Sequence, residues 1–430
     1  MNPWILQSGF PIITLSRDYQ SSAIQVSQEV FLFEPEAKDR LAQSPYGYEW
    51  ITPITFTYNG GPTFIEPNMF WLNETQGRFP LPEASTDNWV LANINRTGYF
   101  RTNYDDNNWR LLQYQLNTDH EQISASSRAA LIGDAFSLAS TGKVNISLAM
   151  NLTKYLFKER KLVPWMVAQE YLGYISQMLR YTSAYGNLKK YIFNQVSLLY
   201  DEVGWNDTGI EVDRQLRSLI LKLACNFGHK GCQNKASEQF KAYYKTGKPV
   251  PPNFRLFVYA YGTSSGGPER DFAWEQYRNG NSTSENLLWL EALSATTEPW
   301  LLSRYLERAL DPEWVRQTDT IEVFKHLGQG NPVGGYLAWN VFRSNWDMLK
   351  KRYAGGLFLM NDLIEAVTIW FNTPFLLQEL ETFSANIASD LTGQAGLSSL
   401  YQASDNTKAN IRWMDMNYHE IKRWLETNVD

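Results

Sequence analysis

The stretch WVLANINRTGYFRTNYDD, residues 89–106, decides the fold class, because the hydrophobic pattern changes its period there. Before Tyr104, short segments such as Tyr48 to Tyr58 alternate apolar with polar or small residues, which is typical of half-buried strands. After Asp105 and Asp106, which are favourable helix N-cap residues, apolar residues recur with a helical period. We therefore predict a small β-sandwich over residues 1–102 and an α-helical domain over residues 103–430.

The second part of the chain consists of many amphipathic segments joined by short connections. Short connections favour antiparallel neighbours, and a long series of such helices stacks as an α-solenoid. No strict sequence repeat is present, so this prediction depends on helix number and loop length. The predicted fold class is multidomain: a small all-β sandwich followed by a large all-α superhelical domain of HEAT-like type.

Composition excludes several classes of function. The 430 residues carry 39 Lys+Arg against 45 Asp+Glu, a formal charge of −6, with no basic block of the kind that nucleic-acid binding needs. No apolar run reaches the length of a membrane span, and the first residues do not resemble a signal peptide. The 16 Trp are spread from Trp4 to Trp424, which indicates packing anchors rather than one ligand-stacking platform.

The two cysteines, Cys225 and Cys232, lie in the segment ACNFGHKGC. Their spacing is too wide for a Cys-x-x-Cys redox site, and no second pair is present for structural zinc. The turn-forming residues between them suit a short disulfide that joins the end of one helix to the start of the next. Two reduced, buried cysteines remain the alternative at this point.

Asn-x-Ser/Thr sequons are slightly more frequent than the composition predicts. Chance predicts about four, and six are present, which is compatible with a glycosylated protein of the secretory pathway. The candidate N-glycosylation sites are Asn73, Asn95, Asn145, Asn151, Asn206 and Asn281.

The chain contains no complete hydrolytic motif. Zinc hydrolases of the H-E-x-x-H type need a second His four residues after the first, but Ser124 and Arg423 stand four residues after His120 and His419. The pattern G-x-S-x-G around Ser264 fits a nucleophile elbow, but the residues before it look helical where a strand is required. The glycine run from Gly328 lacks the third glycine of a dinucleotide fingerprint and is predicted to be a loop. We therefore predict no catalytic and no metal-ligating residue in this chain.

Several segments, in order along the whole chain, resemble the C-terminal half of zinc aminopeptidases of the aminopeptidase-N type, which are gluzincins. Residues 4–11, WILQSGFP, resemble the family's W-x-x-Q-x-G-F-P segment. Residues 89–105 are similar to its N-x-x-G-Y-Y-R-V-N-Y-D block. Residues 271–277 and 300–306 resemble its D-F-A-W and W-x-L-x-R-Y-L segments, and residues 407–413 resemble its final helix.

The resemblance implies a non-catalytic C-terminal region of a metalloaminopeptidase that releases N-terminal residues from peptides. In the family the helical domain covers the zinc site as a bowl that admits short peptides. The family's G-x-M-E-N and H-E-x-x-H segments lie upstream and are not in this sequence, so we expect the chain alone to be inactive. We expect no cofactor in this chain, and zinc in the missing catalytic domain.

The resemblance also bears on individual residues. It supports pairing of Cys225 with Cys232, and a second family pair would fall near Ala260 and Ala295. Residues 353–364, YAGGLFLMNDLI, resemble a family stretch that faces the zinc site. On this reading Phe358 gives the peptide an apolar wall and Asp362, where the family has Asn, gives it a polar contact. The alternative is that Phe358 belongs to the core and that Asp362 complements a helix dipole.

The remaining expectations concern location and partners. The resemblance implies an extracellular or cell-surface, membrane-associated protein whose partners are peptides and the missing N-terminal catalytic domain. A homodimer through the helical domain is a further expectation, and no nucleic acid is expected. The rival hypothesis is a stand-alone α-solenoid module for protein binding or dimerisation, without peptidase activity.

Overall fold

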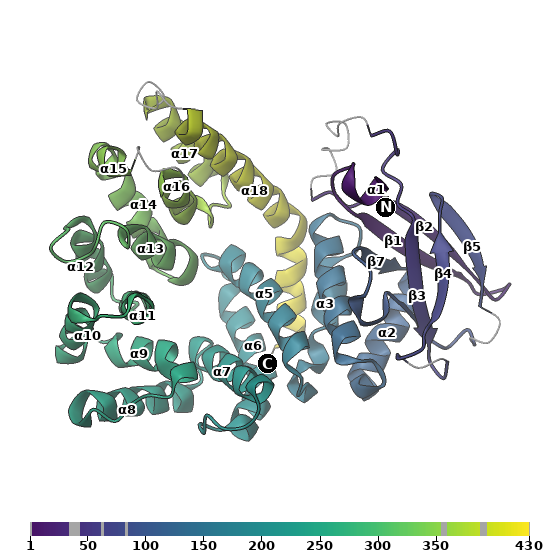
Figure 1. Ribbon diagram of the computed structural model, residues 1–430, viewed down its shortest axis with the longest axis horizontal. Helices are drawn as coiled ribbons and strands as arrows, with labels where there is room; N and C mark the ends of the chain where they lie inside the picture. Colours follow the sequence, from purple (N-terminus) through teal and green to yellow (C-terminus); the bar gives the residue numbers. More distant parts are fainter. Residues whose placement is uncertain are drawn as a thin grey trace. The chain divides into compact units, whose positions relative to one another are not determined.

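The computed structural model describes residues 2–33, 44–61, 64–81, 85–353, 359–387 and 394–429 (Figure 1). Strands near the N-terminus are followed by helices, which confirms the predicted order of the two classes of structure. The chain forms two compact units, one of Met1–Tyr174 with Glu420–Trp424 and one of Ile175–His419 with Leu425–Asp430. The first helices thus belong to the same compact unit as the strands. The predicted domain boundary after residue 102 stays a prediction.

The described strands form two sheets. One has the order β5-β2-β1-β7 and the other has the order β4-β3-β6. The pair β1–β2 is antiparallel, whereas β1 and β7 are parallel. The strands are β1 (Pro11–Asp18), β2 (Ala23–Val30), β3 (Thr52–Tyr58), β4 (Asn68–Leu72), β5 (Gln76–Pro80), β6 (Val90–Ala92) and β7 (Arg101–Tyr104).

A buried glutamine links β2 to segments that flank β3 and β5. The Gln28 side-chain amide donates to the carbonyl oxygens of Trp50 at 2.9 Å and Glu74 at 2.8 Å, and its carbonyl oxygen accepts the Trp50 N–H at 2.8 Å. Trp50 itself is 1% exposed. Because these polar groups are paired, a glutamine can lie in the sandwich core without the cost of unsatisfied hydrogen bonds.

Helices occupy the rest of the described chain. The α-helices are α1 (Asn2–Ile5), α2 (Asp106–Asp119), α3 (Ala125–Ser140), α4 (Ile146–Asn151), α5 (Leu162–Leu179), α6 (Tyr185–Val203), α7 (Glu211–Asn226), α8 (Lys230–Thr246), α9 (Arg255–Thr263), α10 (Pro268–Asn279), α11 (Thr283–Leu293), α12 (Pro299–Leu310), α13 (Thr320–Lys325), α14 (Gly334–Ser344), α15 (Trp346–Tyr353), α16 (Leu359–Thr368), α17 (Pro374–Ile387) and α18 (Gln394–Asn428). Short helical turns are η2 (Ile94–Arg96), η3 (His120–Gln122), η4 (Lys154–Lys158), η5 (Pro252–Phe254) and the π-helical turn η6 (His326–Gly330).

The packing within the second unit is that of a solenoid. Helices that follow one another pack together, as α8 does with α9 and α10 with α11. Alternate helices also pack together, since α11 contacts both α9 and α13, and α12 contacts α14 (Figure 1). Contacts of both kinds define two stacked layers of helices, which confirms the predicted class. Among the described helices, none combines the length and the apolar character that crossing a membrane requires.

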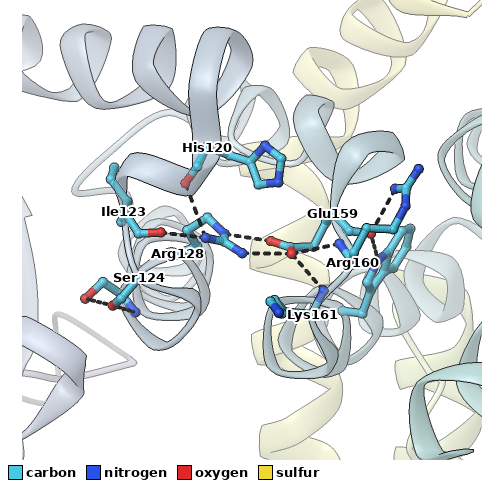
Figure 2. A network of polar contacts seen from close by, with 9 residues as sticks. His120, Ile123, Ser124, Arg128, Glu159, Arg160 and Lys161 are labelled. Atoms are coloured by element: carbon cyan, nitrogen blue, oxygen red, sulfur yellow. Dashed lines mark hydrogen bonds and ion pairs between the residues drawn. The ribbon is translucent and has the colours of Figure 1, made fainter. Parts of the chain in front are cut away.

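A fully buried ion pair fixes the first helices (Figure 2). Arg128 of α3 donates from Nε to Glu159 Oε2 at 2.6 Å and from Nη2 to Oε1 at 2.8 Å, and the two side chains are 4% and 0% exposed. The same guanidinium donates from Nη1 to the carbonyl oxygens of His120 at 3.2 Å and Ile123 at 2.5 Å. One guanidinium therefore holds together α3, the turn before it and the segment before α5.

The carboxylate of Glu159 also accepts hydrogen bonds from the backbone that directly follows it. Its Oε1 accepts the backbone N–H groups of Arg160 and Lys161, each at 2.9 Å (Figure 2). The Glu159 carbonyl oxygen accepts the indole N–H of Trp165 at 3.2 Å, which attaches the first turns of α5 to the same point. Both charges are thus paired and hydrogen-bonded, the condition under which buried charges are tolerated.

We predict that Arg128→Met lowers the free energy of unfolding by about 3–5 kcal/mol, because it leaves the Glu159 carboxylate buried without its cation. Adding Glu159→Gln should recover part of that loss, since the unpaired charge is then absent. The measurement is urea unfolding of the two single variants and the double variant. Lys143→Met, which removes the more exposed pair with Glu29, serves as control and should cost less than about 1 kcal/mol. Strictly additive losses in the double variant would contradict the coupling.

Candidate functional site

The structure describes one of the two residues that were predicted to face a peptide. Asp362 lies in the first turn of α16, and its side chain is 44% exposed. Its Oδ2 is 3.8 Å from Nζ of Lys325, which ends α13 and also lies 3.1 Å from Glu322 Oε1. Phe358 lies outside the described residues. The site therefore contains two carboxylates that share one ammonium, and sequence reasoning missed both Lys325 and Glu322.

The π-helical turn η6 packs directly against α16. A Cβ on Gly328 would lie 1.9 Å from the carbonyl oxygen of Ala366, so no larger residue fits there without a shift of the backbone. The guanidinium of Arg180 donates to the carbonyl oxygens of Gly328, Gln329 and Asn331 at 3.2, 2.7 and 2.9 Å. The glycine run that was predicted to be a loop is therefore a π-helical turn, and Arg180 holds it by hydrogen bonds to its carbonyl oxygens. Turns of this kind occur often at functional sites.

Asn331 fixes the exit from this turn. Its side-chain oxygen accepts the N–H groups of Val333 and Gly334, each at 2.8 Å. Its amide group donates to the carbonyl oxygens of Ser294 at 2.6 Å and Thr296 at 2.7 Å. All these bonds are internal, so the turn acts as a rigid support for α13 and α16.

His326 begins the same turn and is held in its neutral form. Burial lowers the pKa of His326 below its ordinary value, against the opposite effect of Glu291 and Glu322. Its Nδ1 is buried and has no hydrogen-bond partner among the described residues. The charged side chains described around this turn and the start of α16 are Asp362, Glu322, Lys325 and Arg180.

Two other residues with catalytic side-chain types, His229 and Ser264, make hydrogen bonds that stabilise helix ends. His229 caps α8, since its Nδ1 accepts the N–H of Cys232 at 3.1 Å. Ser264 follows helix α9, so the strand that a nucleophile elbow needs is replaced by a helix, and its hydroxyl donates to the Tyr261 carbonyl oxygen at 3.2 Å. Within the described ranges, no group of three His, Cys, Asp or Glu side chains is close enough to bind a metal ion.

The structure contains the disulfide between Cys225 and Cys232. It joins the end of α7 to the start of α8, with 5.1 Å between the two Cα atoms, and both residues are 0% exposed. The carbonyl oxygen of Cys225 also accepts the hydroxyl of Tyr261 at 2.6 Å and the amide of Gln233 at 2.9 Å. The cross-link therefore lies inside a packed contact between three helices.

The sequons differ in accessibility. Five of the six asparagines are exposed, namely Asn73, Asn95, Asn145, Asn206 and Asn281. Asn151 is only half-exposed, its Oδ1 accepts the indole N–H of Trp424 at 2.8 Å, and Thr153 of the same sequon is fully buried. Occupancy at each site stays a prediction.

Comparison with known proteins extends the resemblance that the sequence segments indicated. Residues 89–409 match the sequence model of the ERAP1-like C-terminal domain. The chain is 36% identical over 438 residues to aminopeptidase N of Homo sapiens, covering 100% of this chain and 44% of that protein. It is 33% identical over 437 residues to thyrotropin-releasing hormone-degrading ectoenzyme of Rattus norvegicus, covering 99% of this chain and 40% of that protein. The chain spans less than half the length of these curated relatives.

We predict that Cys225→Ala/Cys232→Ala lowers the free energy of unfolding of the oxidised protein by about 2–3 kcal/mol, because the short loop is no longer closed in the unfolded state. Urea unfolding measures the change. Wild type treated with reductant should approach the stability of the variant, since both then lack the cross-link. If reductant leaves wild type unchanged while the thiols become alkylated, the disulfide carries none of this stability.

We predict that Asn151 stays unmodified when the chain is secreted from cultured eukaryotic cells. The side-chain amide is engaged through Oδ1 with the Trp424 indole, and Thr153 of the sequon is buried, so in the folded protein the sequon is not accessible as the exposed ones are. Peptide mapping after enzymatic deglycosylation in H₂¹⁸O measures occupancy, with the exposed Asn206 as the comparison site within the same protein. Full occupancy at Asn151 in folded, monodisperse protein would contradict the assigned contact.

Proposed function

The chain belongs to the ERAP1-like C-terminal domain family, and from this premise we propose that it is the peptide-admitting, non-catalytic region of an aminopeptidase N-like zinc metalloaminopeptidase. The observation that carries the proposal is the identity to aminopeptidase N along all of this chain, over 44% of that protein's length. The whole enzyme would release N-terminal residues from peptides. Zinc would be bound by a catalytic region that this sequence does not include.

This chain would form part of the wall of the peptide cavity and would give it a negative charge. Asp362 would contact the peptide beyond its first residue, and Phe358 would give it an apolar wall four residues earlier in the chain. Because Lys325 is shared between Asp362 and Glu322, the three groups carry one net negative charge. This charge would disfavour acidic side chains at that position of the peptide.

The proposed setting is the cell surface. A buried disulfide and exposed sequons support an oxidising, extracellular location. Membrane association would then come from the whole protein, and a homodimer through the helical domain stays a prediction.

The test is a chimera in which this chain replaces the matching region of human aminopeptidase N. We predict that the chimera hydrolyses tripeptides, whereas this chain alone neither binds zinc stoichiometrically nor turns over aminoacyl substrates. Asp362→Asn should raise kcat/KM about threefold, or about 0.6 kcal/mol, for tripeptides with an acidic second residue relative to neutral ones. Phe358→Ala should lower kcat/KM for apolar second residues.

The matched control is Glu365→Gln, which removes one exposed carboxylate from the same helix α16. Asp362→Asn should leave the free energy of unfolding within about 0.5 kcal/mol, because its ion pair is half-exposed and Lys325 keeps Glu322. If every tripeptide stays within twofold in both cavity variants, neither residue contacts the peptide. A folded but inactive chimera would favour the stand-alone solenoid module instead.

A further inference from the structure

A cavity of about 180 Å³ lies between α10 and α12, and the proposed peptide site uses none of its residues. Its lining includes three arginines, Arg270, Arg304 and Arg308, against one acidic residue, Asp271. Two tryptophans, Trp274 and Trp300, form apolar parts of the wall. Three positive charges and one negative charge leave a local excess of two positive charges, in a protein whose formal charge is −6.

The spacing of these residues along α10 and α12 places them on the helix faces that line the cavity. Trp300, Arg304 and Arg308 follow one another at intervals of four along α12, and Arg270 and Trp274 have the same interval on α10. Figure 1 shows the two helices as neighbours. At their beginnings, a Cβ on Gly266 would lie 3.4 Å from Leu301, and further along, the Arg308 guanidinium lies 4.9 Å from the Trp274 ring centroid.

Arg270 is a buried cation without an anionic partner. Its residue is 5% exposed, and it donates to the carbonyl oxygens of Leu293 at 2.7 Å and Thr263 at 3.4 Å. Both hydrogen bonds given for its guanidinium in the described chain thus end on neutral carbonyl oxygens. Burial lowers the pKa of Arg270 to about 10, with the charge of Arg308 acting in the same direction and Tyr305 and Asp271 in the opposite one, so the group is still cationic at neutral pH. A buried, unpaired charge is costly, and an incoming anion would offset that cost.

The other two arginines are positioned without ion pairs in the described part of the chain. The Arg308 guanidinium stacks over the ring of Trp314 at 3.7 Å, which orients its plane while leaving its N–H groups for other partners. Arg304 is exposed and lies one turn before it. Burial and the charges of Arg304 and Arg278 lower the pKa of Arg308 below its ordinary value, and the charge of Asp271 opposes them.

We propose that this pocket binds a small oxyanion, a carboxylate, sulfate or phosphate group, carried on a ring that lies against Trp300. Guanidinium groups match the geometry of such oxyanions with pairs of N–H donors, and three of them line one cavity. Trp300 is 58% exposed at the mouth of the helix pair, which makes its face available to a flat apolar group. The volume suits one small ring with its anionic substituent.

The test uses phenyl phosphate as probe, with inorganic phosphate and phenol as its separate halves, at constant ionic strength. Binding to the full chain is measured by ligand-observed NMR titration. We expect Arg304→Gln and Arg308→Gln each to weaken phenyl phosphate binding about tenfold, as for a lost charge-assisted hydrogen bond. The matched control is Arg110→Gln on α2, which removes an exposed arginine that does not line the cavity and should change the affinity less than twofold.

Further titrations separate the contribution of the probe's aromatic ring from that of its anionic group. Trp300→Ala should reduce the affinity for phenyl phosphate to that for inorganic phosphate, and phenol alone should not bind. Phenyl sulfate and benzoate carry the same phenyl ring as phenyl phosphate, so their relative affinities identify the preferred oxyanion. Equal loss in Arg304→Gln and Arg110→Gln, or no saturable binding of any probe to wild type up to about 10 mM, would overturn the proposal. Circular dichroism verifies that each variant is folded.

Discussion

The ion pair between Arg128 and Glu159 is the constraint on which the start of the helical region depends. Two charges with almost no exposure are stable only if both are paired and every remaining hydrogen-bonding group is satisfied. That requirement fixes α3, the His120–Ile123 turn and the start of α5 at the same time. On the same helix α3, the buried Asp134 accepts the backbone N–H of Thr102 at 2.9 Å, so β7 is attached to a helix whose own position is already determined.

Much of the fold could be predicted from the sequence because its signals are local. Pro299 opens α12, because proline is favoured in the first helical turn. Asp105 caps α2 by accepting the N–H of Asn108 at 2.9 Å. The period change after Tyr104 likewise needs only adjacent residues. Local preferences of this kind still hold in the folded protein, because they depend on residues within one helical turn or one strand.

Other elements lack such signals, so the sequence alone does not indicate them. Edge strand β5 contains Gly77 and ends at Pro80, two residues that weaken a strand pattern and are tolerated only at an edge. Helix α14 begins with Gly334 and Gly335, which usually indicate a turn, and α6 has no side-chain cap. In these cases tertiary packing decides the conformation: Gly335 is buried, and a Cβ there would lie 2.8 Å from Trp370.

The same distinction separates the predictable from the unpredictable part of the sites. The two cysteines are near neighbours in sequence, so their pairing could be inferred, whereas Lys325 reaches Asp362 only through the packing of α13 on α16. The arginine pocket arises in the same way, because Arg270 and Arg304 lie on separate helices that the solenoid stacks. Within the described residues, stacking thus places an acidic cluster and a basic cavity in a chain of formal charge −6, and local fields of this kind differ in sign from one part of a surface to another whatever the net charge. A solenoid can acquire such sites by substitution on neighbouring helices, since each helix already has its place in the stack.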